Sequence, residues 1–313
     1  MEIHQLRYFC AIARAGSFTR AATEEGISQP SLSQQIVRLE QDLDAKLFDR
    51  LGRRVQLTEF GRALLPQAQE ILRKVNAVRP ALDSVRSGVR GRLNIGCIPT
   101  ITPYFLAPRI GGFAKRYPDV QFRLFEDITP KLVEQLQAGD LDIAIAGLPI
   151  KNPDIVCSEL LRENIVVAVA KGHRLARMPR VKLAELSRER MLLLKEGHCF
   201  RDNALTVCSR GQTQFISVFE TDQFSSIFSL VSSGFGISLV PQMATTEESG
   251  CDFLPLEREA IRRIGYVRAR GHVAGSAQKA FTEWLRETAK RPAPIHPSPA
   301  EPDIAKHQVH AAR

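Results

Sequence analysis

Apolar residues in the first 44 positions recur every three or four residues in three short segments, a spacing that predicts helices. Gly16 and Gly26 separate the segments, and Ser17 and Ser28 stand where N-caps are expected. Pro30 falls in the first turn of the third segment, where a missing N–H costs little. The pattern therefore predicts helices at 3–15, 17–25 and 28–44.

A basic ribbon follows the third predicted helix. Residues 50–57 read RLGRRVQL and turn at Gly52, the pattern of two short strands. Helices followed by such a ribbon form the plan of a winged helix-turn-helix domain, predicted at 1–58. The third helix exposes polar side chains suited to base edges, and the ribbon arginines suit phosphate or minor-groove contact. A solvated helix face with a surface charge cluster is the alternative. The candidate DNA-contacting residues are Gln29, Ser31, Ser33, Gln34, Arg38, Arg50, Arg53 and Arg54.

A longer helical pattern occupies residues 58–85. Its apolar residues keep spacings of three and four throughout: Phe60, Leu64, Ala68, Ile71, Leu72, Val75, Val78 and Leu82. Because no partner helix follows in the sequence, this stripe favours a dimerising linker helix at 59–87. Packing of the helix on its own domain is the alternative. Residues 88–91 then supply a glycine-containing hinge.

Beyond residue 91 the pattern changes to strands alternating with helices. Strands are expected at 93–98, 120–125, 141–146, 165–169, 191–194, 214–218 and 237–240, and helices at 104–116, 130–138, 203–208, 224–232 and 277–288. This alternation predicts parallel sheets with sites at the strand C-termini. About 200 such residues fit two small lobes better than one sheet. We therefore predict an α/β protein with a two-lobed effector domain at 92–290. The proline-rich tail, 291–313, is expected to be disordered.

Charge and composition narrow the choice of partner. The formal net charge of +9 favours an anionic partner, nucleic acid before a membrane. No apolar run approaches the ~18 residues of a membrane span, and the first residues do not read as a signal peptide. We therefore expect a cytoplasmic protein with no membrane partner. Its six cysteines then stay reduced by default, so a disulfide among them would be transient and regulatory.

The segment EGHCFRDNALTVCSRG holds Cys199 and Cys208, nine residues apart. Cys199 is expected at a helix N-terminus, where the helix dipole favours a thiolate, with His198 and Arg201 beside it. Cys208 is expected on an apolar helix face. If one helix holds both, they lie roughly 13 Å apart. A disulfide needs Cα atoms within about 7 Å, so forming one would unravel the helix and make oxidation a switch.

Two other interpretations of this pair stay open. The thiols can simply be two packed and inert side chains. A zinc site is the other alternative, although His198, Cys199 and Cys208 lack the usual Cys-x-x-Cys pairing.

The N-terminal run ARAGSFTRAATEEGISQPSLSQQIVRLEQDLDAKLFDR, followed by LTEFGRALL, resembles LysR-type transcriptional regulators. The resemblance extends to about Thr288. It implies a winged helix-turn-helix, a linker helix and a two-lobed effector domain like that of periplasmic binding proteins. It also implies a homo-oligomer, commonly a tetramer, that binds promoter DNA with RNA polymerase as a further partner. By similarity, the recognition helix carries Gln29, Pro30, Ser31, Ser33 and Arg38.

Two motifs resemble the peroxide-sensing OxyR branch of that family: GHCxRDxALxxC, and IPTITPYFLAP near the first effector strand. The resemblance implies that Cys199 is the peroxidatic cysteine, oxidised to a sulfenic acid, and Cys208 the resolving cysteine. Thr100 and Thr129 would position hydrogen peroxide, and His198 and Asp202 would complete the pocket. A cellular thiol reductant would reset the pair. No cofactor or metal is implied.

One position departs from the pattern of this branch. Its members carry an arginine, on the strand after the second lobe, that helps to hold the thiolate. Aligning the segment IGYVRARG places Ala269 there, and strand alternation turns Arg268 and Arg270 to the opposite face. A shift of register or a bulge would restore an arginine; otherwise thiolate activation is weaker or differently organised.

The sequence thus favours a DNA-binding activator of oxidative-stress genes, switched by Cys199. The alternative is a LysR-type regulator that senses a small metabolite between its lobes, with incidental cysteines. A thiol peroxidase would leave the N-terminal domain without a role, so we predict that the protein is not an enzyme.

Overall fold

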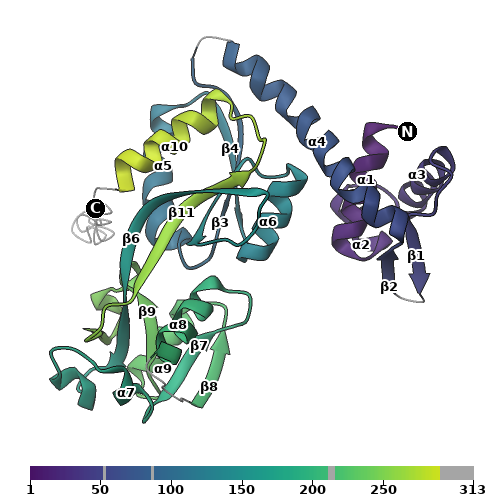
Figure 1. The fold of residues 1–313 in the computed structure, drawn as a ribbon. Helices are drawn as coiled ribbons and strands as arrows, with labels where there is room; N and C mark the ends of the chain where they lie inside the picture. The colour runs from purple at the N-terminus through teal and green to yellow at the C-terminus, as the bar shows by residue number, and fades with distance from the viewer. Residues whose placement is uncertain (52–53, 86–87, 211–215, 290–313) are drawn as a thin grey trace, which may run out of the picture.

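The computed structural model describes residues 1–51, 54–85, 88–210 and 216–289 (Figure 1). The N-terminal domain consists of α1 (Ile3–Ala15), α2 (Phe18–Glu24), α3 (Gln29–Asp42) and a ribbon of β1 (Phe48–Leu51) and β2 (Arg54–Leu57). Ser17 and Ser28 cap α2 and α3 through their hydroxyls, as the sequence predicts. Phe9, Ile12 and Leu32 are fully buried where the three helices meet.

The single long helix α4 (Glu59–Val85) leads from this domain to the effector domain (Figure 1). Its first half packs against α1, because Ala68 and Leu72 belong to the N-terminal core. A different set of apolar residues on the same helix stays exposed: Phe60, Ile71, Val75, Val78 and Leu82. The packing alternative therefore holds for one face of α4, and its role in dimerisation stays a prediction. One face packs on its own domain, and another offers an apolar stripe to a partner.

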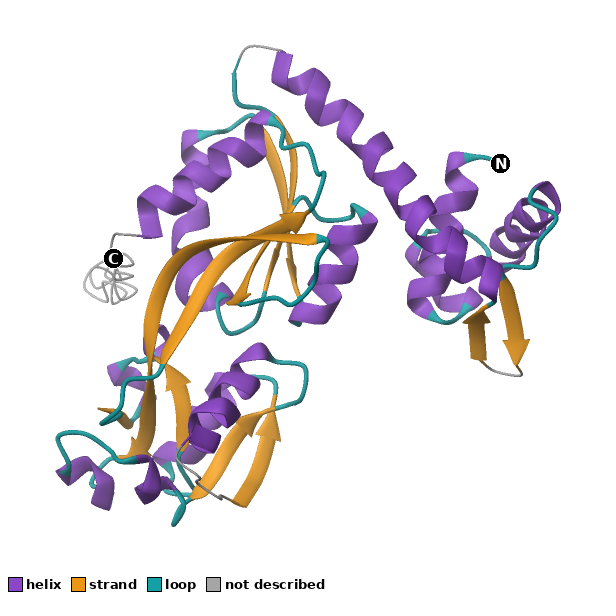
Figure 2. Ribbon diagram, viewed as in Figure 1, coloured by secondary structure: helices purple, strands orange, loops and turns teal. Residues whose placement is uncertain are grey.

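The effector domain begins with lobe I, whose helices cover both faces of a sheet (Figures 1 and 2). The elements of lobe I are β3 (Gly91–Cys97), a π-helical turn (Thr102–Leu106), α5 (Ala107–Arg116), β4 (Val120–Glu126), α6 (Thr129–Ala138), β5 (Ile143–Leu148), β11 (Ile261–Ala269) and α10 (Ser276–Ala289). Parallel pairs β3–β4 and β3–β5 give the predicted α/β character, whereas β11 joins β5 antiparallel.

Lobe II contains α7 (Leu183–Leu186), β7 (Arg190–Leu194), α8 (Cys199–Arg210), β8 (Ile216–Thr221), α9 (Phe224–Ser232), β9 (Ser238–Pro241), the 3₁₀ turn η3 (Gln242–Ala244) and β10 (Cys251–Pro255). The strands β7 and β8 form a parallel pair, and β9 and β10 pair antiparallel with β6. Each lobe has its own buried core. The prediction of two α/β lobes is therefore confirmed.

The strand β6 (Ile155–Ala170) joins the lobes, since it pairs with β11 of lobe I and with β9 and β10 of lobe II. The strand pattern predicts only its second part, 165–169, and not β10, while β11 is expected only by resemblance, around the segment IGYVRARG. The helix pattern read at 203–208 starts four residues after α8 does, whereas the separate expectation of Cys199 at a helix N-terminus agrees with α8. Among the described residues, no helix is both long and apolar enough to cross a bilayer. The predicted tail, 291–313, lies outside the described residues.

Candidate functional site

Cys199 is the first residue of α8, as the sequence predicts. Gly197 allows the turn that precedes it, because its φ of +94° is a conformation that side chains with a Cβ rarely adopt. This loop lies close to lobe I, since a Cβ on Gly197 would stand 2.9 Å from Ile128 Cδ1. The free N–H groups and dipole at the start of α8 favour a thiolate at this position.

Gly147 on β5 brings the backbone of lobe I against the Cys199 thiol. A Cβ on Gly147 would stand 2.9 Å from Cys199 Sγ and 3.7 Å from Arg262 Nε. The thiol therefore belongs to a helix of lobe II but packs against the core of lobe I, whereas Cys208 belongs to the core of lobe II. The sequence pattern gives no sign of this contact between the lobes.

Arg262, on β11, is the buried cation of the site. Its side chain is 0% exposed, its Nη2 donates to Thr100 Oγ1 at 2.6 Å, and its Nη1 lies 3.4 Å from Glu163 Oε1. Its guanidinium carbon lies 5.1 Å from the centre of the Phe200 ring. Its Nε is buried and has no hydrogen-bond partner within the described part of the chain. Arg262 Nε is thus a hydrogen-bond donor near the Cys199 thiol that is not used by these contacts.

The assignment of the strand arginine to position 269 is wrong. Ala269 pairs with Ile155 at one end of β11, whereas Arg262 pairs with Glu163 near the other end. Seven residues of strand separate them by roughly 23 Å. Arg268 and Arg270 donate instead to the carbonyls of His272 and Pro153. The pair of adjacent arginines at 262 and 263 could have indicated the buried cation. Side chains alternate between the two faces of a strand, so one of two neighbouring arginines points inward.

The two predicted threonines lie at the ends of elements in lobe I. Thr100 follows β3, is almost fully buried and accepts the hydrogen bond from Arg262. Thr129 is the first residue of α6, and its Oγ1 is buried without a hydrogen-bond partner among the described residues. A buried polar group without a protein partner is rare, and a water or a small polar ligand can satisfy it. Thr129 Oγ1 and Arg262 Nε are two such groups.

His198 is buried beside Cys199 and has a partner that the sequence did not indicate. Its Nε2 lies 3.3 Å from Asp222 Oδ1, and Lys195 Nζ lies 2.7 Å from Asp222 Oδ2. The hydrogen bond from Lys195, and then that from His198, lowers the pKa of the Asp222 carboxyl. Asp222 thus stays ionised and orients the imidazole. The sequence feature that could have pointed to Asp222 is an acidic residue directly after β8, the strand that pairs with β7.

Two other polar residues of α8 point elsewhere. Arg201 donates to the Leu194 carbonyl at 2.9 Å and pairs with Glu220 at 2.7 Å, so its charge is engaged away from the thiol. The predicted pocket residue Asp202 is exposed in the first turn of α8. The structure does not bury it with Thr100, Thr129 and His198.

Cys208 lies in the same helix as Cys199, and both thiols are free. It is buried in the lobe II core, and this burial raises its pKa to about 11. Nine residues of helix separate the two cysteines by roughly 13 Å along the axis. A disulfide therefore requires α8 to unwind. No cluster of three or more metal-binding side chains occurs within the described ranges.

The candidate DNA-contacting face of α3 is exposed, while Leu32, Ile36 and Leu39 face the core. Pro30, Ser31, Gln34 and Arg38 are exposed, and Gln29 and Ser33 are half-buried. The Ser31 hydroxyl lies 2.7 Å from that of Ser28. Of the ribbon arginines, Arg53 and the side chains of Arg50 and Arg54 lie outside the described residues.

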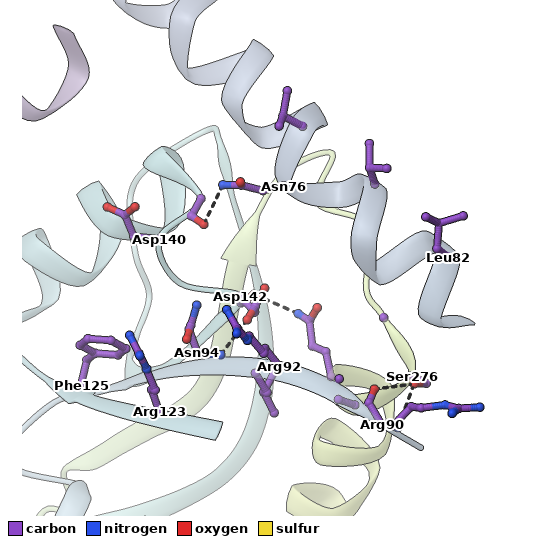
Figure 3. Close-up of a pocket in the computed structure, with 18 residues that line it drawn as sticks. Asn76, Leu82, Arg90, Arg92, Asn94, Arg123, Phe125, Asp140, Asp142 and Ser276 are labelled. Atoms are coloured by element: carbon purple, nitrogen blue, oxygen red, sulfur yellow. Dashed lines mark hydrogen bonds between the residues drawn. The ribbon is translucent and has the colours of Figure 1, made fainter. Parts of the chain in front are cut away.

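A cleft of about 810 Å³ lies elsewhere, between α4 and lobe I (Figure 3). Arg92, Asn94 and Arg123 line it from β3 and β4, and the Asn76 amide of α4 donates to the Gly139 carbonyl at 3.2 Å across it. Its walls belong to α4 and lobe I, so it is separate from the site around Cys199.

Comparison with known proteins matches both halves of the chain to families. Residues 3–62 match the bacterial regulatory helix-turn-helix protein, lysR family, and residues 86–290 match the LysR substrate binding domain. The chain is 36% identical over 267 residues to a probable hydrogen peroxide-inducible genes activator of Mycobacterium avium, covering 84% of this chain and 86% of that protein. It is 32% identical over 290 residues to the DNA-binding transcriptional dual regulator OxyR of Escherichia coli, covering 91% and 95%.

Solved structures agree with this assignment. A full-length OxyR from Pseudomonas aeruginosa, carrying a cysteine-to-aspartate substitution, superposes with a TM-score of 0.71 at 27% identity and covers 91% of this chain and 98% of its own. A cysteine-to-serine mutant of Corynebacterium glutamicum OxyR, described as H₂O₂-bound, has a TM-score of 0.61 at 31% identity and covers 91% and 92%. The chain therefore belongs to the LysR family of DNA-binding transcriptional regulators, in its OxyR branch, whose members are not enzymes.

Proposed function

We propose that this protein activates oxidative-stress genes when hydrogen peroxide oxidises Cys199 and a disulfide forms with Cys208. The observation that carries the proposal is the surroundings of the Cys199 thiol, which lies at a helix N-terminus against Gly147 and beside the buried cation Arg262. Relatives named hydrogen peroxide-inducible genes activators support it. The unpartnered Arg262 Nε and Thr129 Oγ1 are groups that a small molecule with two oxygens can satisfy.

The first chemical step uses a thiolate, the reactive form of cysteine. Its sulfur attacks one oxygen of hydrogen peroxide, so an S–O bond forms and the O–O bond breaks. The hydroxide that leaves takes up a proton and becomes water, and Cys199 becomes a sulfenic acid. In this proposal Thr100, Thr129 and His198 position the peroxide, and Arg262 stabilises the thiolate and the departing oxygen. Asp202 stays a predicted member of the pocket.

In the second step, the sulfur of Cys208 attacks the sulfenic sulfur of Cys199. An S–S bond forms, the S–O bond breaks, and water leaves with the proton of the Cys208 thiol. The pair has then lost two electrons to the peroxide. A cellular thiol reductant returns them by thiol–disulfide exchange. Cys208 must leave the lobe II core for the disulfide to form. Disulfide formation would therefore disrupt α8 and the packing of this core, and lobe II would adopt a new arrangement.

In this proposal, the change in lobe II alters how the N-terminal domain binds DNA. The exposed residues of α3 and the ribbon arginines are proposed to contact promoter DNA, and the apolar stripe of α4 supports pairing of copies, with a tetramer as the expected assembly. Recruitment of RNA polymerase would follow from binding near promoters. The protein is accordingly placed in the cytoplasm, where its DNA lies.

A DNA footprint with and without micromolar peroxide tests the proposal. The wild type is expected to change its footprint, and Cys199→Ser to keep the reduced one. Cys157→Ser is the matched control. Cys157 is an exposed cysteine on β6, and it lies outside the site, opposite Val267 of β11. A peroxide-dependent footprint in Cys199→Ser would reject the proposal. In that case, a small metabolite becomes the better signal.

A further inference from the structure

Glu163 is a buried carboxylate at the junction of the lobes that the proposed chemistry does not use. It lies on β6, directly across from Arg262 on β11, and its side chain is only 7% exposed. Its Oε1 faces Arg262 Nη1 at 3.4 Å, and its Oε2 accepts the Met243 N–H at 2.9 Å. Burial raises the pKa of its carboxyl, and the charge of Arg262 opposes that rise. Each oxygen thus has one partner, one in η3 and one in the thiol site.

The two ends of the Arg262 guanidinium are held by different residues. Thr100 accepts from Nη2 and Glu163 from Nη1, which leaves Nε as the donor on the side of Gly147 and the Cys199 thiol. A buried cation with one partner removed is strongly unfavourable, so this pairing fixes where the guanidinium lies. Glu163 therefore shares with Thr100 in orienting Arg262, and its carboxylate offsets part of the guanidinium charge.

The other charged groups near Cys199 approach from different elements. His198 precedes Cys199, the Asp222 carboxylate reaches it only through His198, and Lys195 is paired with that carboxylate. Asp202 is exposed on α8. Within the described residues, Glu163 is the acid that pairs with the buried cation of the site. Its charge therefore acts on the thiol by way of Arg262.

We propose that Glu163 is a positioning residue that sets the acidity of the Cys199 thiol through Arg262. It holds Nε toward the thiol and offsets part of the guanidinium charge, which keeps the reduced protein from being over-reactive. The inference rests on the proposed function only in taking Cys199 as the reacting thiol.

The test measures the rate of Cys199 alkylation by iodoacetamide against pH in the full-length protein. Trypsin releases Cys199 in residues 196–201, Cys208 in residues 202–210 and Cys157 in residues 152–162, so mass spectrometry reads each thiol separately. Glu163→Gln keeps the size and an acceptor but removes the negative charge. We expect the Cys199 pKa to fall by about one unit, with up to about tenfold faster alkylation below both pKa values.

Arg262→Gln and the double variant test whether Glu163 changes the Cys199 pKa only when Arg262 is present. Arg262→Gln is expected to raise the Cys199 pKa, and adding Glu163→Gln to it should change nothing further. The double variant leaves no uncompensated buried charge, so it is expected to fold even if Glu163→Gln does not. A difference in Cys199 pKa between Arg262→Gln and the double variant would overturn the proposal.

Glu159→Gln is the matched control. It lies on the same strand and also pairs with arginines, Arg162 and Arg263, but at the surface. Its Cys199 pKa should equal that of the wild type. A Glu163→Gln protein that is folded by its thermal unfolding curve, with the wild-type Cys199 pKa, would contradict the proposal. Because no peroxide is used, failure of the peroxide response leaves this result intact.

Discussion

At the scale of single residues, Gly147 is a point at which lobe I closely approaches the Cys199 thiol of lobe II. The absence of a side chain on this β5 residue lets Cys199 Sγ and Arg262 Nε approach the same point of the backbone. A strand position that carries a glycine often marks such a close approach. The reactivity of Cys199 is therefore expected to depend on packing in lobe I, although its own helix belongs to lobe II.

Gly147→Ala is expected to slow the reaction of Cys199 with peroxide by about tenfold or more. The new methyl group would stand 2.9 Å from Sγ, so the thiol must move away from its neighbours. Overpacking of this kind also costs about 1–3 kcal/mol in the free energy of unfolding. Stopped-flow measurement of thiol loss gives the rate, and urea unfolding gives the stability.

Gly111→Ala controls for the general effect of adding a methyl group. Apart from its chain neighbours and the backbone of its own helix, no atom lies within 4 Å of a Cβ at this position in α5, so the reaction rate should not change. The exchange should stabilise the helix by about 0.5–1 kcal/mol. Equal peroxide rates in both variants and the wild type would show that the Gly147 contact has no influence.

Burial of Cys208 makes stability depend on pH on the alkaline side. Its pKa is raised from 9.0 to about 11 in the folded protein, so between these values the folded state retains a proton that the unfolded chain has lost. Its stabilising contribution is complete below pH 9 and declines as the pH rises toward 11. Urea unfolding of the wild type and Cys208→Ala should show a stability difference that shrinks over this range. Curves that stay parallel would contradict the burial of this thiol.

At the scale of elements, α8 is the part of the structure that must change for the disulfide to form. It holds Cys199 at its first turn and Cys208 near its end, the latter packed with Phe200 and Ala204 in the lobe II core. The bond can form only in a state in which several turns are lost. The helical stability of α8 is therefore expected to control the proposed second oxidation step and to leave the first unchanged.

Paired substitutions at Thr206 separate these two steps. Thr206 is exposed in the middle of α8, so Thr206→Ala raises helix stability and Thr206→Gly lowers it, a span of about 1 kcal/mol. Disulfide formation should be up to about fivefold faster in the glycine than in the alanine variant, with equal rates of sulfenic acid formation. Rapid quenching with mass spectrometry measures both. An opposite order of disulfide rates would exclude unwinding as the controlling event.

The elements also show what can be read from sequence and what cannot. The helices of the N-terminal domain carry local signals, such as the caps Ser17 and Ser28, and their predicted bounds agree within a few residues. The position of Arg262 depends instead on the register between β11 and β6, which includes a bulge beside Ile264. Register between strands distant in sequence has no local signal, so the helix-start position of Cys199 could be predicted but its neighbour Arg262 could not.

At the scale of the whole molecule, lobe I connects the thiol site with the DNA-binding domain. It contacts Cys199 at Gly147, and at its other side Asp140 pairs with Arg14 of α1 at 2.5 Å. Asn76 of α4 bonds to neighbouring Gly139. A rearrangement of lobe II thus acts on a lobe that is already joined to both α1 and α4.

The apolar stripe of α4 is expected to join two copies of the chain. Val78 and Leu82 are 58% and 61% exposed and lie four residues apart, the spacing of neighbouring core positions in a heptad repeat. Leu82→Glu should therefore shift the protein toward monomers and weaken DNA binding by about tenfold or more, as seen by analytical ultracentrifugation and gel shift. Glu70→Lys, an exposed charge change in the same helix, is the control and should stay oligomeric. A Leu82→Glu protein of unchanged mass would show that copies associate elsewhere.

The most direct test of the central claim is the tryptic map of the protein after one equivalent of hydrogen peroxide. The account predicts that residues 196–201 and 202–210 become joined by a Cys199–Cys208 disulfide at the same peroxide dose that changes the DNA footprint. It also predicts that a thiol reductant reverses both. A changed footprint in a protein whose Cys199 and Cys208 peptides both remain free thiols would contradict the account.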